Sequence, residues 1–600
     1  MHRINKIHGK DARYLSELPE FKDGLPHGVV NKTRADVGGT FVAANCDCNY
    51  IIVCPFRDLV DSIAADKNNK YPVFKCYGGS RELSFNKYLK DNKIRKIAVT
   101  YDSLPKLISW LGDDLSGWKL LIDEYHLILE DMDFRSDAIE NLLDNVQKFS
   151  HYTFLSATPI NEVFEIDFLK QLPHYQVIWD NDIKIQPIRI QCRHLTKGLS
   201  KFIQIFLDEG IKAPDVNGNV TEVEELYIFV NSVATIKQVI DTVGLMPDEV
   251  KICCADRIRN SRILGDYPIE SVVSPSKTVN FFTKKCFQGC NLFSNNGLII
   301  IASDAYKTQT LVDVSTTMEQ IVGRLRVNDE YNNVFRNTFI HMYSTNHNIP
   351  DNDEFMLLME EKEKEARLLI SGWENLNAEQ RAVYFKRLNL EGELVSVVDD
   401  KMVYNHLKKQ SFIFKQELRQ CYKDGVSVRN SFANSDKFVA TDTQYWNDLS
   451  IKLAKATTVS YEQLLKEYLE HPSESYELDY PEFAEFRKYL KESEMNTLRW
   501  NKEKMLSLVN DKKLLPKAFF RIHKRGFISN AELKTKMKTV FDRLEIKTAP
   551  KASLIEDCDM YSVKRTSKRI KGRMVQGYEL GPIYLSNVPV KEVFDPPKES

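Results

Sequence analysis

The sequence predicts an α/β protein with two lobes, each built on a parallel sheet. Along the first part of the chain, short apolar runs of strand length alternate with amphipathic stretches of helical length. The runs lie at residues 51–54, 97–100, 120–122 and 153–155, and the amphipathic stretches include 58–65 and 136–147. Strands that alternate with helices indicate a parallel sheet with right-handed crossovers. A second series begins after Pro187, with apolar runs at 226–230, 298–301 and 338–343.

Length, composition and the N-terminus narrow the class of protein. A chain of 600 residues suggests about three or four domains. The apolar runs are far shorter than the roughly 20 residues of a transmembrane helix, and Met1–Lys6 lacks the apolar core of a signal peptide. We therefore expect a soluble protein of the cytoplasm, the host cytoplasm if it is viral, with no membrane partner. The eleven cysteines lack the spacing of a disulfide framework or a zinc site, which indicates reduced structural thiols.

Two apolar runs end on polar residues that suit phosphoryl transfer. Residues 120–122 are followed by Asp123-Glu124-Tyr125-His126, and residues 153–155 are followed by Ser156-Ala157-Thr158. Ligands of open α/β sheets bind just beyond the carboxyl ends of the strands. There, Asp123 can hold a Mg²⁺ ion, and Glu124 can orient and deprotonate an attacking water. The alternative is two buried strands with polar ends that arose by chance.

The Asp-Glu-x-His and Ser-Ala-Thr residues resemble those of the superfamily 2 helicases. The resemblance implies an ATP-dependent motor with Mg²⁺ and two RecA-like P-loop lobes, at residues 1–185 and 186–345. It also implies that His126 and Gly289 contribute to the nucleotide site. Residues 346–495 then form a helical, charged region, with helices expected over 353–367, 411–429 and 461–468. The run of charged residues at 353–367 is best explained by a solvated helix face.

The phosphate-binding loop departs from the family pattern. The aligned stretch runs from Thr33 to Thr40, where Gly38 and Thr40 match the pattern and Thr40 is a second candidate Mg²⁺ ligand. Gly39, however, stands where the family has the lysine that neutralises phosphate charge. Either Lys32, just before the loop, reaches the phosphates instead, or the loop is a remnant with little turnover. A lysine at position 39 is expected to be tolerated or activating. The alternative is that this stretch is an ordinary turn with no role in phosphate binding.

Other first-lobe residues match motifs that touch the nucleic-acid strand in the family. Arg57 follows a predicted strand and can contact phosphates without reading sequence. Thr100, Ser156 and Thr158 lie at positions where the family also contacts the nucleic-acid strand. Taken alone, each of these residues is better explained by a turn or a strand end than by a contact, so the evidence lies in their order along the chain.

The second lobe carries the run Gln320-Ile321-Val322-Gly323-Arg324-Leu325-Arg326. In the family such a run places a guanidinium opposite the nucleotide site of the first lobe, as an arginine finger. The resemblance assigns Gln320 and Arg324 to catalysis. A second arginine is expected at position 327, which is valine, so Arg326 is the remaining candidate. The alternative is the capped start of a basic helix.

Residues 496–600 form a basic C-terminal module. Between positions 496 and 580 there are 21 Lys and Arg against 9 Asp and Glu, a net charge of about +12. Helices are expected at 529–544 and 552–557, followed by two strands around a basic turn, which resembles the wing of a winged-helix module. The basic residues are Lys564, Arg565, Lys568, Arg569, Lys571 and Arg573. They can supply salt-dependent contacts to phosphates, unless the hairpin is merely solvated.

The resemblance implies an ATP-dependent DNA helicase or translocase. The C-terminal tail is also similar to tails of replication proteins of phages and mobile elements, which implies a role in the replication or recombination of a virus or mobile element. Its partners would be single-stranded or forked DNA and replication proteins. The alternative is a DNA-binding or virion-associated protein with a decayed motor, which the missing lysine favours. A motor coupled to a nuclease is not supported, because the tail has no cluster of nuclease residues.

Overall fold

The computed structural model describes most of the chain in two compact units. The described residues are 4–34, 37–112, 115–160, 164–180, 184–287, 290–328, 330–377, 380–381, 390, 392–439, 441–447, 450–570, 572–584 and 587. One compact unit comprises residues 1–256 and 263–457, and the other comprises 257–262 and 458–600. None of the described helices combines the length and the apolar content needed to span a membrane.

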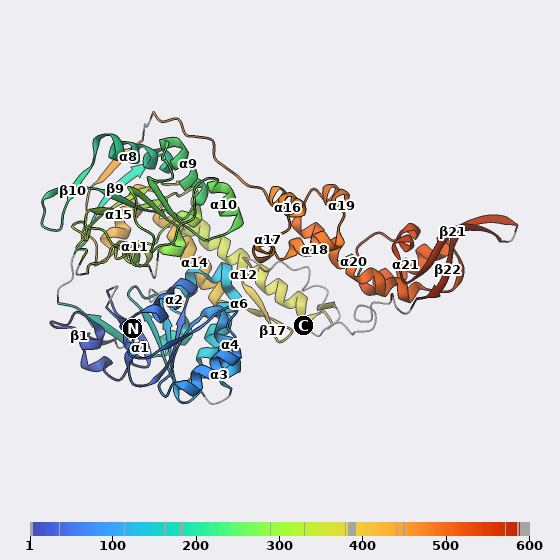
Figure 1. Cartoon of the computed structure of the whole chain (residues 1–600), viewed down its shortest axis with the longest axis horizontal. Helices are drawn as coiled ribbons and strands as arrows, with labels where there is room; N and C mark the ends of the chain where they lie inside the picture. The colour runs from blue at the N-terminus through green and yellow to red at the C-terminus, as the bar shows by residue number, and fades with distance from the viewer. Residues whose placement is uncertain are drawn as a thin grey trace. The chain divides into compact units, whose positions relative to one another are not determined.

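The first lobe is built on an eight-stranded parallel sheet in the order β1-β8-β2-β7-β6-β3-β5-β4 (Figure 1). Its strands are β1 (Ile4–His8), β2 (Gly28–Asn31), β3 (Asn49–Cys54), β4 (Val73–Cys76), β5 (Lys96–Thr100), β6 (Trp118–Asp123), β7 (His151–Ser156) and β8 (His174–Ile178). The helices are α1 (Gly39–Asn45), α2 (Arg57–Ala65), α3 (Glu82–Asp91), α4 (Leu104–Leu111), α5 (Leu127–Glu130), α6 (Met132–Val146) and α7 (Asp167–Lys170). Alternate residues of the strands enter two separate cores, one on each face of the sheet.

The second lobe is built on a seven-stranded parallel sheet in the order β13-β14-β12-β15-β16-β9-β19. Its strands are β9 (Gln186–Cys192), β12 (Glu225–Phe229), β13 (Val250–Cys253), β14 (Val279–Phe282), β15 (Gly297–Ser303), β16 (Thr338–Tyr343) and β19 (Thr443–Trp446). The helices are α8 (Leu195–Glu209), α9 (Val233–Val243), α11 (Thr317–Val322) and α15 (Gly425–Ala433). Most of α10 (Ile258–Leu264) belongs to the other compact unit. Strands β10 (Lys212–Pro214) and β11 (Val220–Glu222) form a separate hairpin. The predicted α/β fold with two parallel sheets in tandem, like RecA lobes, is confirmed.

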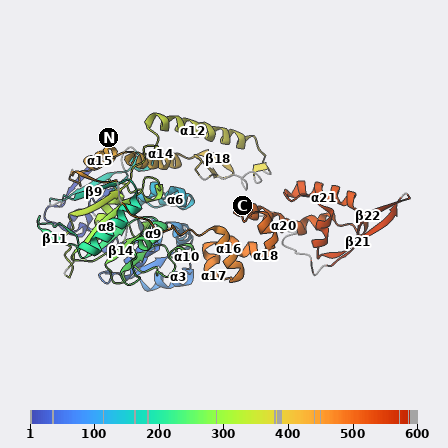
Figure 2. The ribbon, with the colours of Figure 1, turned by 90° about the horizontal axis from the view of Figure 1, so that it is seen from above.

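The segment after the second lobe returns to it. Helix α12 (Asn352–Glu374) runs beside the hairpin of β17 (Val395–Val398) and β18 (Lys401–Tyr404), as Figure 2 shows. Helix α14 (His406–Cys421) then packs on α5 and α6 of the first lobe. Strand β19 finally pairs with β9, so the second sheet takes a strand from residues that the sequence analysis places in the helical region. The helix predicted over 411–429 is in fact two helices, α14 and α15.

The second compact unit is helical and ends in a small antiparallel sheet. Its helices are α16 (Tyr461–Glu470), α17 (Glu474–Asp479), α18 (Glu482–Tyr489), α19 (Glu492–Thr497), α20 (Lys502–Ile522) and α21 (Asn530–Leu544). The sheet has the order β20-β22-β21, with β20 (Gly526–Ser529), β21 (Tyr561–Ile570) and β22 (Arg573–Ile583). The predicted helix at 529–544 and the two strands around the basic turn are confirmed. Residues 552–557, predicted as an α-helix, form the 3-10 helix η7 (Ala552–Asp557) instead.

Candidate functional site

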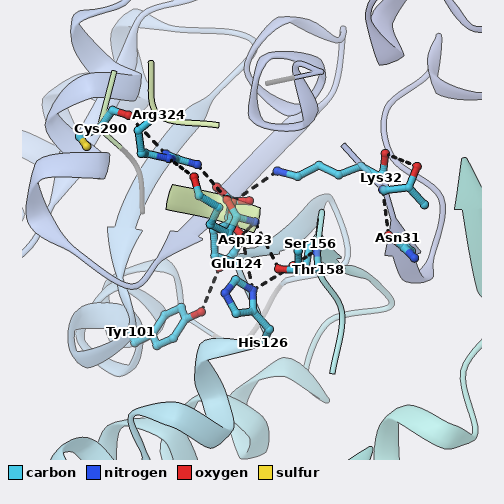
Figure 3. Close-up of polar contacts among 12 residues, drawn as sticks. Asn31, Lys32, Tyr101, Asp123, Glu124, His126, Ser156, Thr158, Cys290 and Arg324 are labelled. Atoms are coloured by element: carbon cyan, nitrogen blue, oxygen red, sulfur yellow. Dashed lines mark hydrogen bonds and ion pairs between the residues drawn. The ribbon is translucent and has the colours of Figure 1, made fainter. Parts of the chain in front are cut away.

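The candidate site lies at the carboxyl ends of three neighbouring strands of the first lobe. Strand β7 lies between β2 and β6 in the sheet. Lys32 directly follows β2, Asp123 is the last residue of β6, and Ser156 is the last residue of β7. Because the strands are parallel and adjacent, their polar end residues meet at one edge of the sheet. Figure 3 shows Lys32 and Arg324 approaching the Asp123–Glu124 pair from opposite sides.

At this edge of the sheet, Lys32 forms a buried ion pair with Glu124. Its Nζ lies 3.4 Å from Oε1 of Glu124, and each of the two side chains is 10% exposed. The backbone around it is held firmly: the Trp179 indole N–H donates to the Lys32 carbonyl at 2.9 Å. The next residue, Thr33, has a φ of +51°, which is an unusual value for a β-branched residue. Lys32 is thus the ammonium group that the first lobe supplies to the carboxylates.

Gly39, at the position where the family pattern has a lysine, packs closely against a neighbouring strand. Gly39 begins α1, and a Cβ built on it would lie 2.4 Å from Cδ2 of the buried Leu155. A methyl group at that distance requires the Leu155 side chain to move. The expectation that lysine is tolerated at position 39 stays a prediction. Residues 35 and 36 of the same loop lie outside the described residues.

The two carboxylates differ in their protonation behaviour. Burial raises the pKa of Asp123 to about 7, against the opposing charge of Lys32. Burial also acts to raise the pKa of Glu124, but the charges of Lys32, His126 and Arg324 together lower it. Asp123 Oδ1 has no hydrogen-bond partner among the described residues, whereas Glu124 is fully engaged. An orphaned buried carboxylate oxygen is the donor that a hard cation requires.

A polar network joins Glu124 to the second lobe. His126 Nδ1 lies 2.9 Å from Ser156 Oγ and 3.5 Å from Glu124 Oε2. The Thr158 backbone N–H donates to Ser156 Oγ at 3.0 Å. Gln320 Nε2 donates both to Glu124 Oε2 and to Thr158 Oγ1, each at 3.3 Å. The network therefore runs from one lobe to the other through buried side chains.

Ser156 and Thr158 belong to this network and not to an exposed surface. They are 0% and 3% exposed, and Thr100 is 5% exposed with its hydroxyl donating to Ser103 Oγ. Direct contact with a nucleic-acid strand is therefore not supported for these three residues in this conformation. Arg57 differs, because it is exposed at the start of α2 with its guanidinium 4.5 Å from the Tyr77 ring centroid.

The arginines of the second lobe follow α11. Helix α11 ends at Val322, so Arg324 lies beyond the helix end, which removes the alternative that this run begins a basic helix. Arg324 is 3% exposed; its Nη2 donates to Gln320 Oε1 at 2.8 Å and its Nη1 to the Cys290 carbonyl at 3.3 Å. Arg326 is partly exposed and donates to Asn291 Oδ1. Gly289, expected beside them, lies outside the described residues.

A cavity of about 640 Å³ brings these predicted residues together. The predicted residues that line it are Lys32, Gly38, Gly39, Thr40, Asp123, Glu124, Gln320, Arg324 and Arg326. The sequence analysis missed Tyr14 and Phe41, which line the same cavity with rings that are each 37% exposed. Tyr14 carried no local signal, because it reaches the cavity only when the N-terminal segment bonds to the loop, through the Leu15 N–H and the Val37 carbonyl.

The residues present fit a Mg²⁺ ion bound mainly by its substrate. In the described part of the chain, no group of three or more His, Cys, Asp or Glu side chains could hold a metal by itself. Magnesium, however, is usually held by one or two carboxylates together with phosphate oxygens and waters. Asp123 offers its orphaned oxygen, and Thr40 lines the same cavity.

Charged contacts beside the cavity also connect the lobes. Lys284 of the second lobe lies 2.9 Å from Asp131 Oδ1 and 3.4 Å from Glu130 Oε2 of the first lobe. Burial acts to lower the pKa of Lys284, but the two carboxylates raise it. Thr317, the first residue of α11, also donates to Glu130 at 2.8 Å. Glu130 ends the short helix α5 (Leu127–Glu130), which begins three residues after Glu124, and Asp131 follows it directly.

The predicted basic residues of the C-terminal module lie on the hairpin of β21 and β22. The described members are Lys564, Arg565, Lys568, Arg569 and Arg573, all of them exposed. Lys564 stands opposite Glu579 across the hairpin. Lys571 lies outside the described residues.

Comparison with known proteins gives similarity of structure only. No family model and no curated protein matches the sequence. Mss116p bound to ssRNA and AMP-PNP is similar over 54% of this chain and 67% of its own, at 13% identity and a TM-score of 0.35. The Escherichia coli DEAH/RHA helicase HrpB is similar over 55% of this chain and 42% of its own, at 15% identity and a TM-score of 0.34. The Mycobacterium smegmatis helicase Lhr, bound to ssDNA and AMP-PNP, is similar over 53% and 44%, at 12% identity and a TM-score of 0.33. Because these identities and scores are low, they carry no conclusion about activity or substrate.

Proposed function

We propose that this chain is an ATP-dependent DNA helicase or translocase of the superfamily 2 type. The observation that carries the proposal is the position of Lys32, whose ammonium lies 3.4 Å from Glu124 inside the cavity between the lobes. An ammonium in this place supplies the positive charge that Gly39 lacks. The same cavity contains an acidic residue with an open oxygen, a general base and two arginines, which is the set that phosphoryl transfer requires.

Each residue has a role in this proposal. Asp123 and Thr40 would hold Mg²⁺, which would neutralise charge on the phosphates of ATP. Glu124, with its lowered pKa, is ionised at neutral pH and would accept a proton from the attacking water. Gln320 holds Glu124 in position at 3.3 Å, and Arg324 or Arg326 would stabilise negative charge from the second lobe. His126 would act indirectly, by positioning Glu124 and Ser156.

The lobes would be coupled to nucleic acid through their shared contacts. Because both lobes line the cavity, nucleotide binding favours the closed arrangement and product release reopens it. Arg57 on the first lobe and the basic hairpin of the C-terminal module would provide phosphate contacts. We assign the substrate as single-stranded or forked DNA. The setting we propose is the replication or recombination of a virus or mobile element, together with other replication proteins.

The experiment that tests the proposal is a Mg²⁺-dependent ATPase assay on the full chain, with single-stranded DNA, forked DNA and single-stranded RNA as effectors. Glu124→Gln should abolish turnover while retaining nucleotide binding, because it removes the base and keeps Asp123. The matched control is Glu222→Gln, which changes an exposed carboxylate of β11. Stimulation by RNA and not by DNA would reassign the substrate.

The runner-up is a DNA-binding or virion-associated protein with a decayed motor. Two observations favour it: a side chain at position 39 would meet the buried Leu155, and Lys32 already forms an ion pair with the candidate base. Turnover of the wild-type chain that does not exceed that of Glu124→Gln at saturating DNA would establish this alternative.

A further inference from the structure

Lys96, the first residue of β5, carries an ammonium group that is buried in the first lobe. The residue is 0% exposed, and its Nζ donates to the Ala43 and Cys46 carbonyls at 2.7 and 2.8 Å. The described polar contacts of Nζ go to these two carbonyls and to one sulfur, with no carboxylate among them. Burial lowers the pKa of Lys96, whereas the neighbouring Cys46 acts to raise it. A charge that has left water is stabilised by an opposite charge beside it, and among these contacts only the sulfur can supply one.

Cys46 is the contact of Lys96 that can become negatively charged. Its Sγ lies 3.4 Å from Lys96 Nζ. The carboxylate of the next residue, Asp47, is exposed and is paired with Lys70 at 2.5 Å instead. As a thiol, Cys46 donates to the Ala43 carbonyl at 3.6 Å; after it loses its proton, the sulfur faces the ammonium. A lysine beside a cysteine stabilises the negative sulfur that acts as a nucleophile.

A second thiol lies beside Cys46. The Cys48 thiol donates to Cys46 Sγ at a sulfur–sulfur distance of 3.5 Å. A disulfide needs about 2.05 Å, so the two sulfurs have to approach by roughly 1.5 Å. Cys46 is 8% exposed and Cys48 is half-buried, and both are free thiols. Burial, together with Cys46, raises the pKa of Cys48, so Cys48 keeps its proton while it donates to Cys46.

We propose that Cys46 and Cys48 are a dithiol modification site for peroxides, with Cys46 as the attacking sulfur and Cys48 as the resolving thiol. The Cys46 sulfur attacks one oxygen of hydrogen peroxide, the O–O bond breaks, and a sulfenic acid and one water are formed. The Cys48 sulfur then attacks the Cys46 sulfur, and the sulfenic hydroxyl leaves as a second water with the Cys48 proton. Two thiols are oxidised to one disulfide while the peroxide is reduced to two waters. The Lys96 ammonium stabilises the negative charge on Cys46 during the first attack.

A purely structural role explains only part of this arrangement. An ammonium that caps the carbonyls at the end of α1 stabilises a helix end, which accounts for the contacts to Ala43 and Cys46. It does not account for the two sulfurs at 3.5 Å. Oxidation makes the Cys46 sulfur neutral, so Lys96 loses its negative partner at the end of the helix whose first turn lines the candidate nucleotide cavity. We therefore expect the disulfide to weaken nucleotide binding, a consequence that rests on the proposed function, whereas the dithiol reaction does not.

The test exposes the reduced full chain to hydrogen peroxide, alkylates the remaining thiols and locates the modified residues by mass spectrometry. The wild type should form the Cys46–Cys48 disulfide before Cys421 and Cys558 react; these two are the matched controls, because they are half-buried thiols like Cys48. Cys48→Ser should stop at the sulfenic acid, which dimedone captures on Cys46. Adding Lys96→Met should slow this capture by at least about tenfold, and Lys96→Arg should recover most of the rate, which a merely structural lysine would not explain.

Two outcomes would overturn the dithiol site. One is oxidation of Cys46 no faster than that of the two control thiols. The other is a sulfenic acid that forms on Cys48 in Cys46→Ser but not on Cys46 in Cys48→Ser. Both results are read from chains that keep Lys96, so they hold even if Lys96→Met fails to fold.

Nucleotide binding is measured separately, with a fluorescent ATP analogue. The oxidised wild type should bind about tenfold more weakly than the reduced form and should recover with dithiothreitol. The double variant Cys46→Ser with Cys48→Ser should show the same affinity before and after the peroxide treatment. Disulfide formation with unchanged nucleotide binding would refute the coupling to the cavity, whereas no nucleotide binding in either state would refute the proposed function alone.

Discussion

Basic residues of this chain lie in two different environments, a buried cavity and an exposed hairpin. In the cavity of the first compact unit, Lys32 is 10% exposed and faces one buried carboxylate. On the hairpin of the second unit, Lys568, Arg569 and Arg573 are exposed, and none of them forms an ion pair with a described carboxylate. A buried charge is weakly screened and depends on one geometry, whereas exposed charges are screened by salt and act additively. The comparison teaches that position decides whether a lysine supplies chemistry or affinity.

The largest expected effect concerns the exposed set. Replacing Lys568, Arg569 and Arg573 together with Gln should weaken DNA binding by roughly a hundredfold at low salt, about equally on unrelated sequences. The log–log salt slope should flatten by about 0.9 for each phosphate that the variant no longer neutralises. Fluorescence anisotropy over a salt series measures both quantities. The control replaces Lys22, Lys67 and Lys90, three exposed lysines of the first lobe, with Gln.

Two results would contradict this prediction. Unchanged affinity would return the hairpin to a merely solvated surface. A loss that is confined to one DNA sequence would show that the hairpin reads bases, because phosphate contacts carry no sequence information.

The next effect concerns the buried residue. Lys32→Ala should lower kcat/KM for ATP by at least about tenfold, or about 1.4 kcal/mol, because among the described residues only Lys32 brings an ammonium to Glu124. The loss should be insensitive to salt, in contrast to the hairpin variants. Lys70→Ala is the matched control, because Lys70 forms an exposed ion pair with Asp47 in the same lobe. Equal steady-state activity of Lys32→Ala and the wild type would rule out the substitution of Lys32 for the missing loop lysine.

A smaller effect is expected on stability when Gly39 is replaced by a residue with a side chain. Gly39→Ala should destabilise the chain by about 1–3 kcal/mol, because its Cβ would displace the buried Leu155. Gly39→Lys should do the same and should not restore activity to Lys32→Ala. Thermal unfolding and the ATPase assay measure the two effects, with Gly78→Ala as the control, since a Cβ there meets nothing within 4 Å. Activation by Gly39→Lys would show that the loop can rearrange to accept the side chain.

The last effect, on how stability depends on pH, concerns a buried histidine that is neutral in the folded chain. Burial, aided by Arg189, lowers the pKa of His341 from 6.5 to about 3, so His341 stays neutral in the folded chain. The unfolded chain takes up a proton below pH 6.5, and stability is therefore lost as pH falls from 6.5 towards 3. His341→Gln should make the melting temperature less sensitive to pH across this window. His347→Gln, at an exposed position, should leave the pH dependence as it is in the wild type. Parallel pH profiles for His341→Gln and the wild type would contradict the prediction.

The sequence predicted the strands and the first-lobe site residues because their signals are local. Apolar runs that stop on Asp123 and Ser156 mark strand ends, and parallel pairing then brings those ends together. The Lys32 hypothesis followed from its place beside the loop, but the packing of Gly39 against Leu155 could not be predicted from either stretch. A contact between residues more than a hundred positions apart leaves no pattern in either stretch.

Other features depended on such distant contacts and were missed. The hydroxyls of Ser156 and Thr158 turn inward because His126 and Gln320 lie beside them, and Gln320 belongs to the other lobe. Tyr14 lines the cavity through a backbone bond between segments with no shared periodicity. Strand β19 is only four residues long, and its partner β9 begins at residue 186.

Because β19 lies far along the chain from β9, the second lobe is incomplete for part of translation. Strand β9 borders β16 on one side, but its other edge stays bare until Thr443–Trp446 emerges, about a hundred residues after β16. At ordinary rates of translation this interval is roughly 5 to 20 seconds. During it the nascent second lobe presents an open strand edge, which is a template for pairing with other chains. A chain cut at residue 345 would keep that edge of β9 permanently and should aggregate, whereas one that extends through residue 447 covers β9 with the short strand β19.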